Sequence, residues 1–269
     1  MDSTFNTRIR IYKYAYDNDV NAALEMAEDS KEFKTFKKQL EKALFKQIVF
    51  VVKEQNYIDT LLMLAKGESP LENQVKAYLS YVALKDEVNF PEYLVWAGTQ
   101  GGQAAYDKLG IDAVFGLQNK KFIAYFNNYS NLLINSVDDY TKRWISQKIQ
   151  DGKNSGLSTF EIVDSIVLDG RDISRIRAER IVLTETARAM ATIEMEAAVR
   201  VGVKEMIWRT SKDERVCPIC GPIEGKQAKI GKPFTGRLNK PPAHVACRCY
   251  LEEVVPTDWL PPNKVWLGD

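Results

Sequence analysis

Histidine is nearly absent from this sequence of 269 residues, because His244 is the only one. A nuclease that activates water with two histidines is therefore excluded. Long apolar runs are missing too, since the longest, such as Ile48–Val52, fall far short of the ~20 residues that span a bilayer. The first eight residues lack the apolar core of a signal peptide. We therefore expect neither a membrane partner nor chemistry that depends on a pair of histidines.

An excess of charge of one sign is also missing. The 37 lysines and arginines nearly balance 36 acidic residues, which leaves a net charge of +1. No field of the whole molecule therefore attracts nucleic acid. Hydrophobic residues make up 45% of the chain, enough for a packed core, and the length fits one large domain or two small ones.

The few cysteines that are present lie close together. All four fall between positions 217 and 249, in Cys217-Pro-Ile-Cys220 and His244-Val-Ala-Cys247-Arg-Cys249, and the second motif includes the lone histidine. A Cys-x2-Cys pair followed by His-x2-Cys-x-Cys is the spacing of a structural zinc site. Two disulfides and four unpaired buried thiols are the alternatives, and nothing directs the chain to an oxidising compartment.

Five candidate ligands compete for the four positions of a tetrahedral zinc ion. Cys217 and Cys220 form the first pair, because a two-residue spacer makes a tight turn. His244 and Cys247 fit as the second pair, and Cys249 could replace either of them, since side chains at i and i+2 of a strand face the same way. The sequence leaves this choice open.

A catalytic metal would need an open coordination position and an acid or base beside it. Glu224 and Asp213 are the acids near the cluster, and we interpret both as solvated loop carboxylates. Zinc deaminases have a His-x-Glu motif followed later by Pro-Cys-x-x-Cys, whereas here the histidine follows the Cys-x-x-Cys pair and has no such glutamate after it. The Cys-x-x-Cys motif also lacks the βαβ unit of a thioredoxin-like redox protein. We therefore expect no enzyme.

Helical periodicity dominates the first two thirds of the chain. Residues 20–85 are expected to be helical, with one apolar stripe on residues 33–51 and a shorter helix over 71–84. Residues 97–116 predict close helix packing and a turn, and a helix is expected over 120–149. The apolar stripe consists of Phe33, Phe36, Leu40, Leu44, Ile48 and Val51.

The last third changes period. A capping box at Ser158–Glu161 opens a helix, a connection over 169–172 precedes a long helix over 173–201, and Gly202 occupies a C-cap position. Strands are expected over 203–210 and 249–255, with a loop-rich segment between them. The tail is extended, with Trp259 and Trp266 as its anchors.

Several motifs then follow in a fixed order. They are Thr184-Glu-Thr-Ala-Arg188, Gly202-Val, Trp208, Asp213-Glu-Arg-Val-Cys217-Pro-Ile-Cys220, Gly225-Lys, Pro241-Pro-Ala-His244 and Cys247-Arg-Cys249. This arrangement resembles the phage Mu protein F-like family of minor head proteins, also called the phage head morphogenesis domain. The resemblance extends from about residue 95 to 255.

The resemblance implies a minor capsid protein of a tailed phage or prophage. Such a protein lies inside the head of the virion, and in the host cytoplasm during assembly. It is non-enzymatic, takes no small-molecule substrate, and associates with the portal protein and other capsid components to assist head assembly, DNA packaging or DNA delivery. The alternatives are a zinc-stabilised nucleic-acid-binding protein and a metal-dependent nuclease.

We therefore expect an α+β fold, predominantly α-helical, with a small antiparallel β zinc-binding module near the C-terminus. The expected parts are a helical region over 1–90, a head-morphogenesis-like domain over 91–255 (helical to 202, zinc module 203–255) and a tail over 256–269. Basic residues outnumber acidic ones around the cysteines, which makes phage DNA a candidate partner. The candidate contacts with nucleic acid or a partner are Lys34, Lys38, Lys42, Lys46, Arg215, Lys226, Lys229, Arg237, Lys240 and Arg248.

Overall fold

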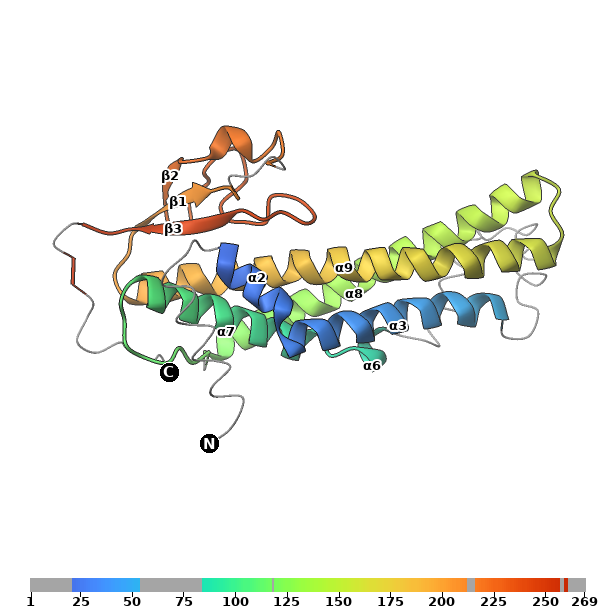
Figure 1. Ribbon diagram of the computed structural model, residues 1–269, viewed down its shortest axis with the longest axis horizontal. Coiled ribbons are helices and arrows are strands. Elements are labelled where there is room, and N and C mark those ends of the chain that lie inside the picture. The colour runs from blue at the N-terminus through green and yellow to red at the C-terminus, as the bar shows by residue number, and fades with distance from the viewer. Residues whose placement is uncertain (1–20, 54–83, 118, 212–215, 257–258, 261–269) are drawn as a thin grey trace. The chain divides into compact units, whose positions relative to one another are not determined.

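The computed structural model describes residues 21–53, 84–117, 119–211, 216–256 and 259–260, and these residues are mostly helical (Figure 1). None of the helices in these ranges combines the length and apolar character needed to cross a membrane. The helices are α2 (Asn21–Asp29), α3 (Lys31–Lys53), α6 (Leu84–Glu87), α7 (Phe90–Lys108), α8 (Lys120–Asn154) and α9 (Thr159–Arg200). The other elements are β1 (Glu205–Arg209), the 3-10 helix η2 (Gly221–Ile223), β2 (Gln227–Lys229) and β3 (Tyr250–Val254).

The described residues pack into two compact units. The helical unit comprises residues 35–91 and 125–179, and the sheet unit comprises residues up to 34, 92–124 and those from 180 onwards. Helices α3, α7, α8 and α9 contribute to both units. The expected domains over 1–90, 91–255 and 256–269 stay predictions, because compact packing does not show which segments fold alone.

The helical unit buries most of the apolar residues of α3 from Phe36 to Ile48, and Ile48 lies against Gly170 of α9. Leu40, Leu44 and Ile48 are completely buried, as the helical spacing predicts. The expected connection over 169–172 is wrong, since α9 continues through it. A Cβ on Gly170 would lie 2.8 Å from Cγ2 of Ile48, so this glycine permits close helix packing and forms no turn.

The turn between α8 and α9 confirms the predicted capping box. The backbone N–H of Ser158 donates to the Glu161 carboxylate at 2.8 Å, and the backbone N–H of Glu161 donates to the Ser158 hydroxyl at 3.3 Å. Both bonds satisfy amides that a helix N-terminus leaves unpaired. The sequence therefore predicted the start of α9 within a residue.

In the sheet unit, α7 packs closely against α9. A Cβ on Gly101 would lie 2.3 Å from the backbone oxygen of Met190, and one on Gly102 would overlap the ring of Phe115. The prediction of close helix packing in this stretch is confirmed. The turn follows at Gly110, whose φ of 67° suits glycine.

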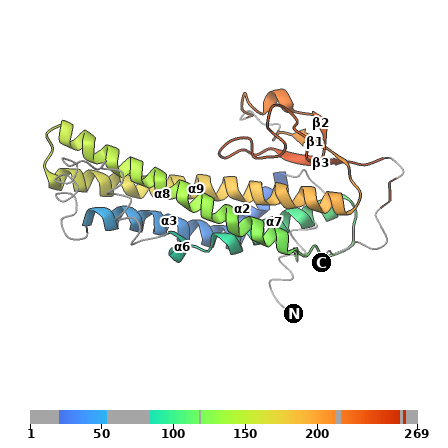
Figure 2. The same ribbon diagram turned by 180° about the vertical axis from the view of Figure 1, so that it is seen from behind.

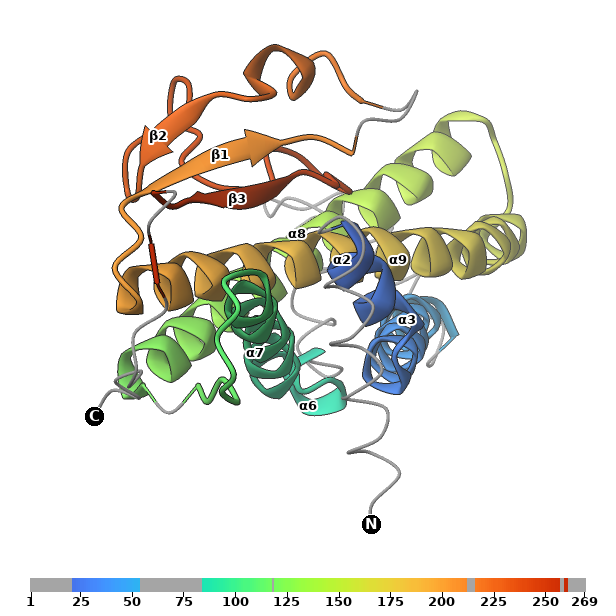
Figure 3. The same ribbon diagram turned by 60° about the vertical axis from the view of Figure 1, so that its left-hand side comes forward.

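The small sheet has the strand order β2-β1-β3 and is antiparallel throughout (Figures 2 and 3). Gly202, with a φ of 88°, ends α9 as predicted, and the chain then enters β1. Both expected strands are present, and Trp208 of β1 is completely buried, 5.5 Å from the ring of Phe234. Strand β2 was not predicted, because three residues among glycines and prolines carry no readable alternation.

Several expectations lie outside the described residues or side chains. They concern most of the helix over 71–84, the side chain of Val51, Asp213, Arg215, and most of the tail over 256–269 with Trp266.

Candidate metal centre

Two short turns of equal length carry the predicted ligands. In the first, the backbone N–H of Cys220 donates to the carbonyl of Cys217 at 3.1 Å and lies 3.3 Å from its Sγ. In the second, the backbone N–H of Cys247 donates to the carbonyl of His244 at 3.2 Å. The two-residue spacers therefore form the tight turns that the sequence predicts. Each turn directs two ligand side chains to one side.

The ligand atoms of these turns meet in space. Cys217 Sγ lies 3.0 Å from His244 Nε2, Cys220 Sγ lies 3.4 Å from the same atom, and Cys220 and Cys247 Sγ atoms are 3.8 Å apart. Around a tetrahedral zinc ion, sulfurs lie about 3.8 Å apart and a sulfur and a nitrogen about 3.5 Å apart. The donor types and most of these separations therefore fit zinc.

All five predicted ligands belong to this cluster. Ligand atoms lie within 4.8 Å of one another in two groups, Cys217–Cys220–His244 and Cys220–Cys247–Cys249, which share Cys220. All four cysteines are free thiols, which leaves no support for two disulfides. The choice of four ligands among the five stays a prediction.

Hydrogen bonds prepare two of these groups for metal binding. The thiol of Cys249 donates to Cys247, which lowers the pKa of Cys247 and raises that of Cys249. The Nδ1 of His244 lies 2.9 Å from the carbonyl oxygen of Val245. A carbonyl only accepts, so the proton lies on Nδ1 and Nε2 faces the thiols as a ligand.

Helix α9 holds the segment that carries the second ligand turn through side-chain hydrogen bonds. The hydroxyl of Thr184 accepts a hydrogen bond of 2.9 Å from the backbone N–H of Ala246, whose φ of 55° is unusual for a residue other than glycine. Two turns along the helix, Thr192 Oγ1 accepts from Lys240 Nζ at 2.6 Å. Burial, together with the charge of nearby Arg188, lowers the pKa of Lys240 to about 8. The helix motif and the cysteine motif therefore lie together because the helix holds the ligand loop.

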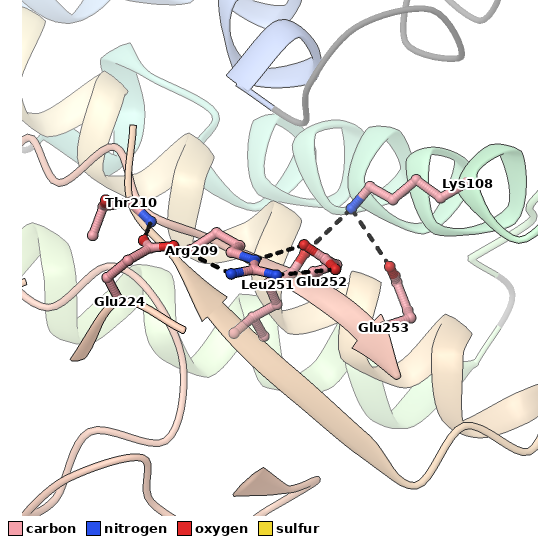
Figure 4. A network of polar contacts seen from close by, with 7 residues as sticks. All are labelled: Lys108, Arg209, Thr210, Glu224, Leu251, Glu252 and Glu253. Atoms are coloured by element: carbon pink, nitrogen blue, oxygen red, sulfur yellow. Dashed lines mark hydrogen bonds and ion pairs between the residues drawn. The ribbon is translucent and has the colours of Figure 1, made fainter. Parts of the chain in front are cut away.

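An ion-pair network joins strands β1 and β3 and the segment after η2 (Figure 4). Arg209 donates to Glu252 at 2.6 and 3.3 Å and to Glu224 at 3.3 Å, and Glu224 also accepts from the backbone N–H of Thr210 at 2.5 Å. Glu224, the nearest candidate acid in the sequence, is therefore occupied by structural partners. Asp213 lies outside the described residues.

A second, buried network joins the sheet to the helices. Lys108 at the end of α7 pairs with Glu194 of α9. Its Nζ also lies 3.8 Å from the carboxylate of Glu253 on β3 and 3.4 Å from the carbonyl oxygen of Leu251 (Figure 4). Burial raises the pKa of Glu253 to about 7 and also raises that of Glu194. The sequence did not predict this network, because its members come from three distant segments with no shared spacing.

The lysines of α3 that were expected to contact a partner fall into two groups. All four are exposed. Lys34 and Lys46 form ion pairs with neighbouring acidic side chains, whereas Lys38 and Lys42 form none with a described residue. An exposed pair contributes little stability but reduces the local positive charge. The positive charge of these four α3 lysines is therefore partly neutralised.

The basic residues around the cysteines also differ in their surroundings. Lys226, Lys229 and Arg237 are exposed, whereas Arg248 and Lys240 are half-buried. Lys240 is tied to α9 as described above. The structure therefore brings together all the expected metal ligands but leaves the expected basic contacts in unlike environments.

Comparison with known proteins gives one match. No curated protein and no solved structure matches the chain. Residues 142–252 match the family described as Phage Mu protein F like protein, a phage head morphogenesis family, and this confirms the predicted resemblance over that part of the chain.

Proposed function

We propose that this protein is a minor component of a tailed-phage head that associates with the portal protein and assists assembly, DNA packaging or DNA delivery. The observation that supports it most is the family match over residues 142–252, which implies a place in the virion beside capsid components. The matched segment contains Thr184, the ligand turns and most of the sheet.

We further propose that the metal is zinc and that its role is structural. Thiolates and one imidazole are the ligands of structural zinc sites. The module they enclose has short strands and many turns, so it gains from a metal that converts binding free energy into folding free energy. Cys217, Cys220 and His244 would hold the ion with Cys247 or Cys249.

The surroundings of the cluster support a non-enzymatic role. The single histidine lies among the thiols, and the carboxylate of Glu224 is held by Arg209 and by the backbone of Thr210. A metal-dependent nuclease is the competing function. A plasmid-nicking assay with Zn²⁺ or Mg²⁺ is expected to give no cleavage. Cleavage that disappears in Glu224→Ala would contradict the proposal.

Co-purification tests the head association directly. The protein is co-expressed with the portal and scaffold genes of the same phage, and portal rings and heads are isolated by gradient centrifugation. We expect the wild-type chain to sediment with them and Cys217→Ser/Cys220→Ser to be lost. The surface variant Lys120→Gln/Lys121→Gln, which leaves the metal site intact, serves as the control. If the wild-type chain stays at the top of the gradient, the proposal is wrong.

A further inference from the structure

A groove of about 940 Å³ opens at one end of the sheet, away from the ligand turns along the strands. It lies where α9 ends, where β1 begins and where β3 ends. Its lining combines aliphatic side chains with one aromatic side chain, two lysines and one glutamate. The lining includes Val203, Val254, Trp259, Lys204, Lys229 and Glu205.

The acidic and the exposed basic side chains of this module differ in whether they have a bonding partner. The acidic residues described between 203 and 256 all have partners inside the module or the sheet unit. Glu205 accepts from Gln227, and the other three belong to the two networks of Figure 4. The side chain of Glu252 is partly exposed but is paired with Arg209, so the exposed charged side chains without an ion-pair partner are all basic among the described residues of this module. They are Lys204, Lys226, Lys229, Lys232 and Arg237.

None of these five basic side chains forms an ion pair with any described residue. The four lysines on α3 differ in this respect, because Lys34 and Lys46 are paired with acidic side chains. An unpaired lysine beside an apolar groove keeps its full charge available for a ligand. Two of the five, Lys204 and Lys229, line the groove, and the carboxylate of Glu205 beside them already accepts from Gln227, so the groove suits an anionic partner.

We propose that this groove binds nucleic acid, with Lys204 and Lys229 contacting phosphates and Trp259 stacking on a base. An acidic protein surface would use the lysines but has no need of an aromatic side chain in the same groove. A nucleic acid strand supplies both a phosphate chain and flat bases, and aromatic side chains in positively charged grooves bind such strands. The inference rests on the proposed role in DNA packaging or delivery and assigns that role a site of contact with DNA.

The test measures binding of the full-length zinc-loaded chain to a fluorescein-labelled 30-nucleotide single strand by anisotropy, over a series of salt concentrations. We expect Lys204→Gln/Lys229→Gln to weaken binding on the order of tenfold and to reduce the salt slope by about 1.4. Trp259→Ala is expected to weaken binding about fivefold or more, with rescue in Trp259→Phe. Lys120→Gln/Lys121→Gln, which changes two exposed lysines at the start of α8 outside the groove, is the control and is expected to bind like wild type.

A labelled polyglutamate of equal charge separates nucleic acid from an acidic protein partner. We expect it to bind more weakly than the single strand and to be unaffected by Trp259→Ala. Equal affinity for polyglutamate, or wild-type affinity in Lys204→Gln/Lys229→Gln, would overturn the groove assignment even if the chain still binds DNA elsewhere. A wild-type chain that binds no DNA, yet sediments with heads, would remove DNA as a partner and leave the head association standing.

Discussion

The hydroxyl of Thr184 holds the second ligand turn at Ala246, where the backbone adopts a left-handed conformation. It accepts the backbone N–H of Ala246, a residue with a φ of 55°. The left-handed conformation costs a non-glycine residue roughly 1–2 kcal/mol, so the turn depends on contacts of this kind. The role of Thr184 is therefore to position a loop that carries metal ligands on both sides.

Thr184→Val keeps the shape of the side chain but removes the acceptor. We expect the free energy of zinc binding to fall by about 1 kcal/mol, which corresponds to about a fivefold lower zinc affinity. Competition with a chromogenic chelator measures this affinity. Thr184→Ser keeps the hydroxyl and should retain wild-type affinity. Equal zinc affinity of the valine and serine variants would show that this hydrogen bond does not support the site.

At the scale of elements, two helix glycines test how closely the helices pack. A Cβ on Gly101 would overlap the backbone of Met190 at 2.3 Å, which cannot move without shifting α9. One on Gly170 would meet a methyl group of Ile48 at 2.8 Å, which can move slightly. We expect Gly101→Ala to cost about 2–3 kcal/mol. Gly170→Ala should be near neutral, because the helix propensity of alanine offsets the crowding by about 1 kcal/mol. Urea unfolding of both variants measures the difference, and equal stabilities would contradict it.

The same glycines show what the sequence could predict and what it could not. Local signals succeeded: the capping box at Ser158, the C-cap at Gly202 and the two-residue spacers between ligands each depend on neighbouring residues alone. Gly170 was mistaken for a break because its reason, the side chain of Ile48, lies on another helix. The network around Lys108 was missed for the same reason, since it joins three elements.

At the scale of the whole molecule, the buried acids of the Lys108 network make stability depend on pH. Glu194, Glu252 and Lys108 surround Glu253, and burial raises its pKa from 4.5 to about 7. A pKa that is higher in the folded state gives stability that is full below the unfolded value and is lost as the pH rises towards 7. Glu253→Gln mimics the protonated side chain. We expect it to raise stability on the order of 2 kcal/mol at pH 8 and to change little at pH 5. Chemical unfolding of both proteins at the two pH values measures this, and the same effect at pH 5 and pH 8 would contradict it.

Metal removal tests how the two kinds of structure in this chain are held together. The helices bury continuous apolar stripes and should survive without zinc, whereas the strands between residues 203 and 255 lie among loops tied by the ligands. Zinc contributes on the order of 10 kcal/mol to folding in small zinc-finger peptides. We therefore expect chelation, or Cys217→Ser and Cys220→Ser, to release zinc and expose residues 203–255 to protease while most of the helical circular dichroism remains. Cys249→Ser identifies the ligand set, because zinc measured by elemental analysis persists if Cys247 is the fourth ligand and is lost if Cys249 is. A module that resists protease equally well with and without metal would show that packing alone, and not the ion, holds it in shape.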